Sequence, residues 1–321
     1  MSDSLPSHAL GWTWQGGGSP AELRLRERQL APLQPGQVLV RNHAIGLNPV
    51  DWKVLASQMN KVPGVDGAGE VVALGPEVDR RWLGARVAYH QSLKQPGSFA
   101  SYTPLAVQVL MRLPDSLSYV AAAAFPCPAL TAFQALEKIP PRPGAPLLIA
   151  GAGGSVGHYL VQLAHARGFE VITASHARHW PRLQKLGASQ CLADALMQWR
   201  QPYYAVIDAV SADQAARLSH ALQANGHLVC IQDRVEQWPN PPFGRAISLH
   251  EVALGALHQH GDTAQWRSLT QHGERMLLAM SQGTLHGESI LTFPFEALPQ
   301  QLLALQHRNF SGKQVIDVLN S

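Results

Sequence analysis

The sequence has little cysteine, little net charge and no long uninterrupted apolar run. Its three cysteines, Cys127, Cys191 and Cys230, are far apart and odd in number, which excludes a disulfide framework and favours a reducing compartment. The formal charge is only +3 and the basic residues are scattered, so no nucleic-acid surface is indicated. Prolines interrupt the most apolar stretch, residues 119–136, which excludes a membrane span, and no signal-peptide pattern opens the chain. We therefore expect a cytoplasmic protein.

The composition is that of a folded protein with two domains. The chain has 321 residues, of which 46% are hydrophobic and 15% charged. Roughly the first 120 residues read as short strands separated by Pro-Gly and Gly-Pro turns. From about Cys127 strands and helices alternate, which predicts a doubly wound parallel sheet. The predicted fold is α/β, with a first domain at 1–126 completed by 263–321, and a second domain at 127–262.

A glycine-rich segment follows the first strand of the second domain. It reads Gly151-x-x-Gly154-x-x-Gly157, with Ser155 and Val156 between the last two glycines, and a helical pattern of Val156, Leu160, Leu163 and Ala164 runs on from it. A dinucleotide pyrophosphate needs backbone N–H groups within hydrogen-bonding distance, and a Cβ atom at Gly154 would block it. Gly157 would let the helix pack closely on the strand. In this strand–helix context the segment predicts a Rossmann dinucleotide-binding domain.

The end of the next strand indicates which dinucleotide is bound. A site that prefers NAD usually places Asp or Glu there, but no acid follows Glu170 in this stretch. Ser175 can donate a hydrogen bond instead, and Arg178, His179 or Arg182 can pair with a 2′-phosphate. These residues predict NADPH as the cofactor; the alternative interpretation is an ordinary basic helix start.

Several segments together resemble the medium-chain dehydrogenase/reductase superfamily, in its zinc-independent quinone oxidoreductase-like branch. The resemblance covers nearly the whole chain and implies a GroES-like β-rich substrate domain, a cleft against the Rossmann domain, and a homodimer. Besides the glycine loop, the matching segments are Gly46-Leu-Asn-Pro-Val-Asp-Trp-Lys53, Pro63-Gly-Val-Asp-Gly-Ala-Gly-Glu-Val71, Gly84-Ala-Arg-Val-Ala-Tyr89, Gly97-Ser-Phe-Ala-Ser-Tyr102 and Pro128-Ala-Leu-Thr-Ala-Phe133.

The resemblance also argues against a metal. Where zinc-dependent relatives carry two cysteines and a histidine as catalytic ligands, the corresponding positions here look like Asn48, Val65 and Cys127. One soft ligand of three cannot hold a catalytic zinc ion. We expect no metal site.

Two residues are candidates for the catalytic centre. The resemblance points to Asn48, whose amide can donate to a carbonyl oxygen; the alternative is an Asn that caps the loop before Pro49. Tyr89 could present a phenolic donor, or it could be a core aromatic residue with a satisfied hydroxyl. In the same motif as Asn48, Asp51 is expected to brace the loop, and Lys53 to be a surface charge or a phosphate contact.

Three further residues are placed near the cofactor by the resemblance alone. Thr131 would approach the nicotinamide ribose, Ile231 lies in the stretch whose backbone would hold the carboxamide, and Lys313 matches a Gly-Lys pair near the cofactor.

The sequence therefore predicts an NADPH-dependent, zinc-free oxidoreductase that transfers hydride to a small-molecule electrophile, namely a quinone or related conjugated carbonyl. An enone or alkenal double-bond reductase would use the same fold and cofactor. A hypothesis of another class is a non-catalytic NADPH-binding redox sensor. Fold-level analogy does not choose among them.

Overall fold

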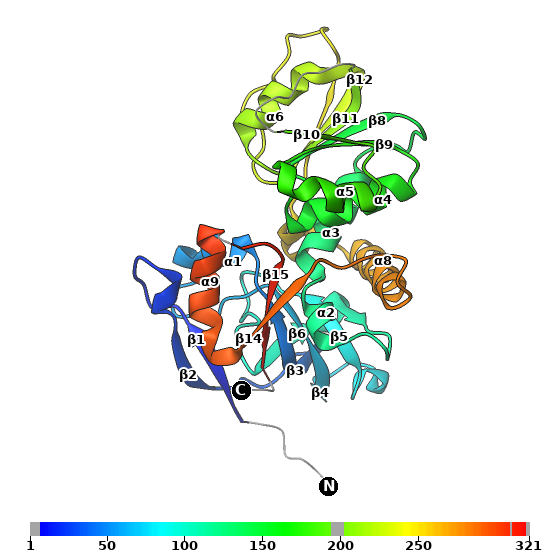
Figure 1. The fold of residues 1–321 in the computed structure, drawn as a ribbon. Helices are drawn as coiled ribbons and strands as arrows, with labels where there is room; N and C mark the ends of the chain where they lie inside the picture. The colour runs from blue at the N-terminus through cyan, green and yellow to red at the C-terminus, as the bar shows by residue number, and fades with distance from the viewer. Residues whose placement is uncertain (1–6, 194–201, 309, 319–321) are drawn as a thin grey trace. The chain divides into compact units, whose positions relative to one another are not determined.

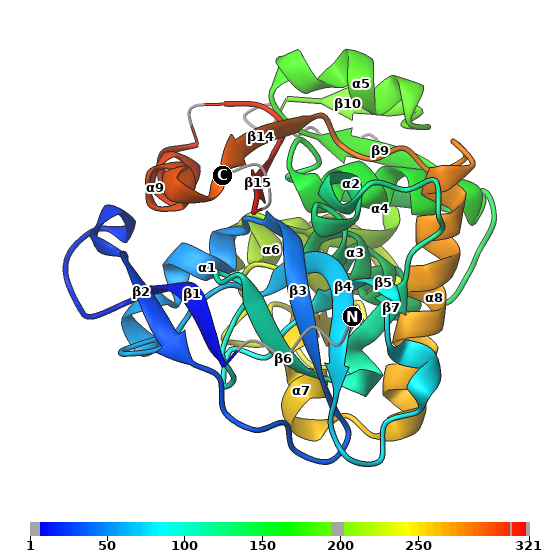
Figure 2. The same cartoon turned by 90° about the horizontal axis from the view of Figure 1, so that it is seen from below.

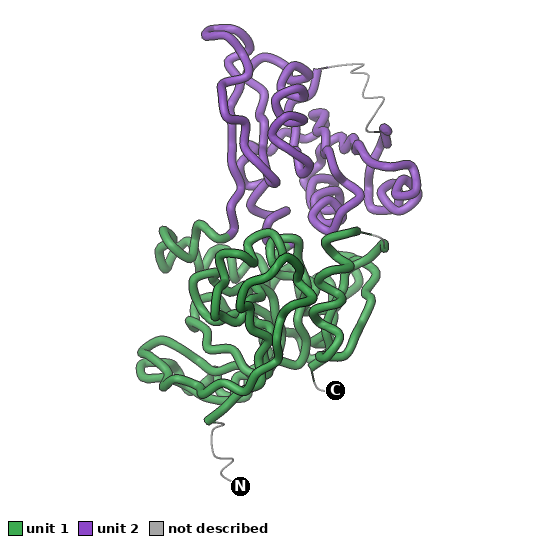
Figure 3. Tube along the Cα trace, turned by 90° about the vertical axis from the view of Figure 1, so that its left-hand side faces the viewer, with its two compact units in different colours: residues 1–127, 255–321 green, residues 128–254 purple. Residues whose placement is uncertain are grey.

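The computed structural model describes residues 7–193, 202–308 and 310–318 of the chain (Figure 1). The chain divides into two compact units, one formed by residues 1–127 with 255–321 and the other by residues 128–254 (Figure 3). Residues 255–262, which the sequence-based division placed in the second domain, cluster with the first unit. There His258 stacks on His90 and packs against Trp266.

Unit 2 is built on a six-stranded parallel sheet. Its strands are β8 (Pro146–Ala150), β9 (Glu170–Ala174), β10 (Gln190–Leu192), β11 (Tyr203–Asp208), β12 (Leu222–Cys230) and β13 (Ser248–Glu251). They are ordered β10-β9-β8-β11-β12-β13, and all neighbouring pairs are parallel. The order reverses between β8 and β11, which is the topological switch point where doubly wound sheets bind ligands. The predicted α/β fold with a doubly wound parallel sheet is confirmed.

Helices cover both faces of this sheet. Figure 1 shows α4 (Ser155–Ala166) and α5 (Trp180–Lys185) on one side of β8 and β9, and α6 (Ala212–Leu218) on the other. Alternate strand side chains such as Leu148, Val206 and Leu228 form a buried cluster with Ala215 and Leu218 of α6. Burial on both faces explains why these strands read as continuous apolar runs in the sequence.

Unit 1 contains a seven-stranded, mostly antiparallel sheet. It consists of β3 (Gln37–Gly46), β4 (Asp66–Leu74), β5 (Arg86–His90), β6 (Tyr102–Ala106), β7 (Leu110–Arg112), β14 (Ile290–Pro294) and β15 (Lys313–Asp317). The order is β14-β15-β3-β4-β5-β7, and β6 pairs with β3. A separate hairpin is formed by β1 (His8–Thr13) and β2 (Arg24–Gln29).

The C-terminal segment completes unit 1. Strand β15 pairs antiparallel with β3, so residues near position 315 lie beside residues near position 45. Phe295, Leu298 and Leu302, around the start of α9 (Leu298–His307), pack in one buried cluster with Trp14 and Ile45. The remaining helices are α1 (Pro49–Lys53), α2 (Tyr119–Ala123), α3 (Pro126–Glu137), α7 (Leu257–His260) and α8 (Thr263–Ser281). Figure 2 shows α8 alongside β7, with which it is in contact.

Among the described residues, no helix combines the length and the apolar character that crossing a lipid bilayer requires.

Candidate functional site

The glycine loop of unit 2 connects β8 to α4, and its three motif glycines have different structural roles. Gly151 has a φ of +75°, a backbone conformation that favours glycine. A Cβ atom on Gly157 would lie 2.4 Å from the backbone oxygen of Ala152, so only glycine lets α4 pack this closely on the loop. The prediction that Gly157 permits close packing agrees with this geometry.

Gly154 differs from the other two because its missing Cβ leaves open space. It is the N-cap residue of α4, with φ −84° and ψ 177°, a conformation that any residue adopts. The nearest atom to an added Cβ would be the Gly151 backbone oxygen at 3.8 Å. The first turn of an α-helix directs backbone N–H groups toward its start and attracts anions there, and in this chain that turn begins at Ser155. This open, amide-lined helix start fits a dinucleotide pyrophosphate.

Basic side chains after β9 lie against the same loop. The Arg182 guanidinium donates to the backbone oxygen of Gly153 at 2.7 Å. The His179 ring covers Gly153, whose added Cβ would lie 2.5 Å from the ring. Arg178 is exposed and its Nε lies 3.1 Å from His179 Nε2, while Ser175 is buried at the end of the strand. Three cationic or titratable side chains therefore gather beside the helix start of α4.

The carboxyl ends of β11 and β12 approach the other side of the switch point. Asp208, a buried residue that the sequence analysis missed, accepts hydrogen bonds at Oδ1 from the backbone N–H groups of Val210 and Ser211. The Ile231 N–H donates to the Asp208 backbone oxygen at 2.9 Å. Asp208 thus shapes the turn after β11 next to Gly151, because Val210 lies where a Gly151 Cβ would point. Its sequence signal was an acid that directly ends an apolar strand.

Unit 1 buries a polar network around Asn48. The Asn48 amide nitrogen donates to Asp66 Oδ2 at 2.9 Å and to the Gly46 oxygen at 3.3 Å. The Lys313 ammonium donates to Asn48 Oδ1. The structure therefore brings Asn48 and Lys313 together from positions 265 residues apart. Both hydrogens of the Asn48 amide group already have protein acceptors.

Two carboxyl groups complete this network. Asp51 accepts from the backbone N–H groups of Asn48 and Val65 and so braces the loop, as the sequence suggested. Asp66 Oδ2 also accepts from the Cys127 N–H at 2.8 Å, while its buried Oδ1 has no hydrogen-bond partner among the residues that the structure describes. Sequence reasoning missed Asp66, although an acid within the apolar, glycine-rich Val65–Gly69 segment was a signal.

Burial controls the protonation of both carboxyl groups. Desolvation raises the pKa of Asp51 and of Asp66 to about 7 in each case, and the nearby Lys313 ammonium opposes the rise in both. One group in this network can therefore hold a proton near neutral pH while another carries charge.

Tyr89 lies elsewhere in unit 1. It is fully buried, its hydroxyl donates to Asn42 Oδ1 at 2.6 Å, and Thr103 Oγ1 lies 3.2 Å away. Burial raises the pKa of the Tyr89 hydroxyl above its ordinary value, which disfavours loss of its proton. Of the two interpretations that the sequence left open for Tyr89, the structure agrees with the second: Tyr89 is a core aromatic residue whose hydroxyl group is hydrogen-bonded. Nothing in a single sequence distinguishes a tyrosine in the core from one at a site.

The other residues that the sequence singled out lie outside the two clusters described above or are already engaged in them. Thr131 is buried in α3, and Lys53 is exposed at the end of α1 with its ammonium 5.7 Å from the centre of the Trp52 ring. Of the positions aligned with zinc ligands, Asn48 is engaged in the network and Val65 is a buried hydrophobe. Among the described residues, no group of three or more His, Cys, Asp or Glu side chains is arranged to hold a metal ion.

A histidine pair lies in unit 1. His90 Nδ1 is 3.1 Å from His258 Nε2, and the two rings stack. Burial lowers the pKa of His90 to about 3, assisted by His258, and lowers that of His258 to about 4. Both rings are neutral in the folded protein at neutral pH.

This pair predicts a loss of stability in acid. Because the folded pKa values lie below the ordinary 6.5, the unfolded chain binds more protons below pH 6.5, and stability falls as pH drops from 6.5 toward 4. Each group contributes up to about 1.4 kcal/mol per pH unit. His258→Phe keeps a ring on Trp266 and should reduce this slope in urea unfolding measured at several pH values.

The exposed His260 offers the control, since His260→Phe should leave the slope unchanged. The raised pKa values of Asp51 and Asp66 give a slope of opposite sign, but they are common to all three proteins and cancel in the comparison. Equal slopes for His258→Phe and the parent protein would contradict the prediction.

The chain is similar in sequence to one protein family and to individual oxidoreductases. The alcohol dehydrogenase GroES-like domain family matches residues 34–115. The chain is 30% identical over 237 residues to the chloroplast envelope quinone oxidoreductase homolog of Arabidopsis thaliana, covering 68% of each chain. It is 34% identical over 203 residues to 2-methylene-furan-3-one reductase of Solanum lycopersicum, covering 58% of this chain and 52% of that protein. The chain thus spans about half the length of that relative.

Solved structures show the same fold. The quinone oxidoreductase from Coxiella burnetii superposes with a TM-score of 0.81 over 97% of this chain and 99% of that chain, at 24% identity. This likeness bears on the fold, and it includes both the GroES-like part and the parallel sheet that the sequence predicted.

Proposed function

Because the chain belongs to the medium-chain dehydrogenase/reductase superfamily, in its quinone oxidoreductase-like branch, we propose that it is an NADPH-dependent, zinc-free oxidoreductase that reduces a quinone or related conjugated carbonyl. The observation that carries this proposal is the open helix start at Gly154, flanked by the basic segment that follows β9. It offers a dinucleotide both a pyrophosphate cradle and partners for a 2′-phosphate.

The residues that would hold the cofactor follow from this geometry. The loop amides would take the pyrophosphate, and Ser175, Arg178 and His179 the 2′-phosphate. Thr131, Ile231 and Lys313 are proposed for the nicotinamide side on the basis of the family resemblance. When bound, NADPH supplies the hydride. The loop residues proposed for the pyrophosphate are Gly151, Gly154, Ser155, Val156 and Gly157.

We propose that the buried polar network of unit 1, formed by Asn48, Asp66 and Lys313, balances the negative charge that develops on the substrate during reduction. Reduction of a conjugated carbonyl places negative charge on its oxygen, which a donor or a proton has to balance. Lys313 supplies a fixed positive charge, and Asp66 Oδ1 is an atom without a partner that can carry a proton near neutral pH. Asn48 joins the two groups and orients them. Asn48, proposed from sequence as a direct donor, is therefore proposed here as a positioning residue.

Arg178→Glu should change cofactor preference more than cofactor affinity in general. An exposed guanidinium near a doubly charged phosphate is replaced by a carboxylate that repels it, so NADPH affinity should fall by about tenfold or more. NADH lacks that phosphate, and its affinity should change by no more than about twofold. Dissociation constants from intrinsic tryptophan fluorescence would measure both. Equal losses for the two cofactors would contradict the phosphate role.

Turnover tests the proposal directly. The purified protein is incubated with NADPH, or with NADH in parallel, and with a panel of ortho-quinones, para-quinones and enones, while a metal chelator is present throughout. Chelator-resistant oxidation of NADPH is the expected result. Activity that is lost with chelator and restored by zinc would overturn the metal-free assignment.

The ranking of substrates decides between two enzymatic candidates. An enone double-bond reductase is favoured by one observation, the likeness to 2-methylene-furan-3-one reductase, and preference for enones over quinones would support it. NADPH binding without turnover on any member of the panel would favour the non-catalytic redox sensor. The homodimer and the cytoplasmic location remain predictions from the sequence.

A further inference from the structure

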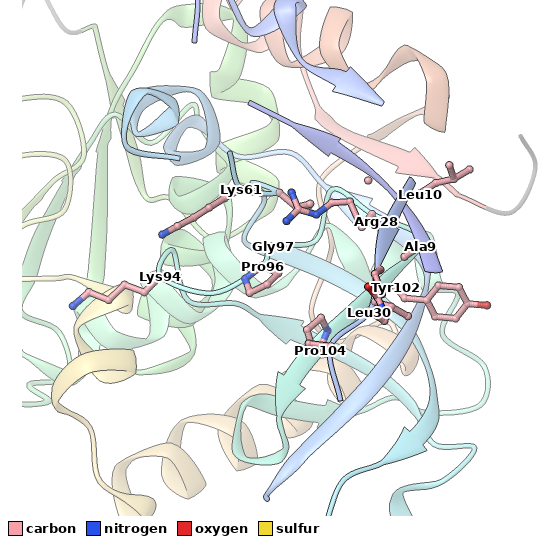
Figure 4. A pocket seen from close by; sticks show the side chains of 15 residues that line it. Ala9, Leu10, Arg28, Leu30, Lys61, Lys94, Pro96, Gly97, Tyr102 and Pro104 are labelled. Atoms are coloured by element: carbon pink, nitrogen blue, oxygen red, sulfur yellow. The ribbon is translucent and has the colours of Figure 1, made fainter. Parts of the chain in front are cut away.

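A partly open cavity of about 290 Å³ lies in unit 1 under the β1–β2 hairpin (Figure 4). This volume is just below the range for small-molecule pockets, roughly 300–1,000 Å³, so a ligand here would be small. It shares no residue with the glycine loop or with the buried Asn48 network. Its lining comes from β1 and β2, from the chain around Lys61, and from residues 94–104: Ala9, Leu10, Gly11, Arg28, Gln29, Leu30, Ala31, Lys61, Val62, Lys94, Pro96, Gly97, Ala100, Tyr102 and Pro104.

The walls of the cavity are held in place by backbone hydrogen bonds. The Trp12 N–H donates to the Phe99 oxygen at 2.8 Å, and the Gly97 N–H donates to the Val62 oxygen at 2.8 Å. Ser101 and Leu10 are also joined through their backbone atoms. The cavity is therefore part of the folded framework, because its three wall segments are joined to one another.

Small and apolar residues form the inner surface. Ala9, Val62 and Ala100 are buried, and a Cβ on Gly11 would already lie 3.1 Å from the Val62 side chain. Leu30 is half-buried beside them. Because β1 contributes Ala9, Leu10 and Gly11 to the lining, the inner part of the cavity suits an apolar group.

The rim carries positive charge and no acid. Arg28, Lys61 and Lys94 are exposed, and none of the lining residues is Asp or Glu. No salt bridge involving these three cations is found among the described residues. Arg28 donates to the backbone oxygen of Asn60, the residue before Lys61, at 3.1 Å, while the exposed side chains of Lys61 and Lys94 extend away from Arg28 (Figure 4).

The hairpin register adds to this charge. Arg28 lies opposite Ala9 and Arg26 opposite Gly11, so both arginines share the face of the hairpin that covers the cavity. Glu27 lies on the other face, opposite Leu10. The whole chain contains similar numbers of basic and acidic residues, 25 and 22. The lining of this cavity, by contrast, contains basic residues and no acidic ones. The three cations have no acidic residue beside them in the cavity lining, so their charges attract an anion at the rim.

We propose that this cavity is a second ligand site that binds a small organic anion, with an apolar body against Val62, Leu30 and Ala100 and a carboxylate, sulfonate or phosphate among Arg28, Lys61 and Lys94. The site is independent of the proposed reductase function, because it uses none of that function's residues.

A charged fluorescent probe and its neutral analogue test the site. The anionic probe is 8-anilinonaphthalene-1-sulfonate, and the neutral one is N-phenyl-1-naphthylamine, which lacks the sulfonate. Saturable binding of the anionic probe is expected, weaker at high sodium chloride and unchanged by excess NADP⁺. The double variant Lys61→Glu/Lys94→Glu should weaken the anionic probe by about tenfold or more and leave the neutral probe unchanged.

The controls separate this cavity from other binding. Arg80→Glu reverses another exposed charge in unit 1 and should leave the anionic probe's affinity unchanged to within about twofold. In Gly154→Val, whose cofactor loop is altered, the probe should still bind. Affinity that is insensitive to the double variant, or probe displaced by NADP⁺, would overturn the proposal. Circular dichroism of each variant verifies that it is folded, and Lys94→Glu alone serves if the double variant is not.

Discussion

Replacing Gly154 with valine should abolish NADPH binding while the protein stays folded. The added side chain would enter the space that a pyrophosphate needs, and no protein atom closer than 3.8 Å opposes the first carbon atom. Loss of the amide contacts should lower NADPH affinity by about 100-fold or more, which corresponds to about 2.8 kcal/mol. Fluorescence titration with NADPH measures the affinity, and urea unfolding measures the stability.

Two other glycines make this experiment specific. Gly18→Val introduces the same side chain at a glycine that also has open space and ordinary φ, and it should leave NADPH affinity unchanged. Gly157→Val should instead unfold or severely destabilise the protein, because its Cβ would lie 2.4 Å from a backbone oxygen. In Gly154→Val, valine is a poorer N-cap than glycine, which costs about 1 kcal/mol of stability at most. Undiminished NADPH affinity in Gly154→Val would refute the assignment of the loop.

Replacing Lys313 with methionine should destabilise the protein by about 3–5 kcal/mol. The side chain is buried, its ammonium donates to Asn48 Oδ1, and it lowers the pKa of both Asp51 and Asp66. Removing one member of a buried charged network leaves the others uncompensated, which is the reason for the large expected loss. Urea unfolding followed by circular dichroism measures it.

The pH dependence of this loss gives a second readout. Without the Lys313 ammonium, the pKa of Asp66 in the folded protein rises further above its ordinary value. The Asp66 carboxyl group then stays protonated to a higher pH in the folded protein, while in the unfolded chain it is ionised. The penalty of Lys313→Met should therefore be larger above pH 7 than below it. Asp66→Asn in the Lys313→Met background removes the uncompensated carboxyl and should recover part of the stability.

An exposed lysine provides the control for this series. Lys185→Met, on α5, should change stability by no more than about 0.5 kcal/mol. A loss for Lys313→Met that is equally small, or one independent of pH, would show that the ammonium does not balance the buried carboxyl groups.

Local pattern was enough to predict the dinucleotide half of the protein. The strand, the glycine loop and the helix start at Ser155 are contiguous, so periodicity and glycine spacing predict them together. The basic residues after β9 belong to the same short stretch, and the structure places Arg182 and His179 against Gly153. What sequence reasoning missed here was Asp208, because its contribution depends on the turn that its side chain caps.

The catalytic candidates show where such reasoning stops. Tyr89 and Asn48 each had two interpretations that a single sequence could not separate. In the structure the Tyr89 hydroxyl is satisfied inside the core, and the Asn48 amide donates to Asp66 and Gly46, so the role of Asn48 in the reaction stays a proposal. The apolar, glycine-rich surroundings of Asp66 were a signal of its burial, but its partners Asn48 and Cys127 are distant in the sequence and only the fold brings them together.

The sequence by itself determined the α/β class, the doubly wound parallel sheet of one domain and the glycine loop, since these depend on residues close together along the chain. Only the tertiary structure decided the composition of the buried network and of the anion cavity. Lys313 meets Asn48 across 265 residues because β15 pairs with β3, and Lys61 and Lys94 line one cavity because residues 61–62 and 94–97 are joined by backbone hydrogen bonds. Burial then set the protonation of Asp51 and Asp66, since desolvation acts only on a group that the folded chain has removed from water.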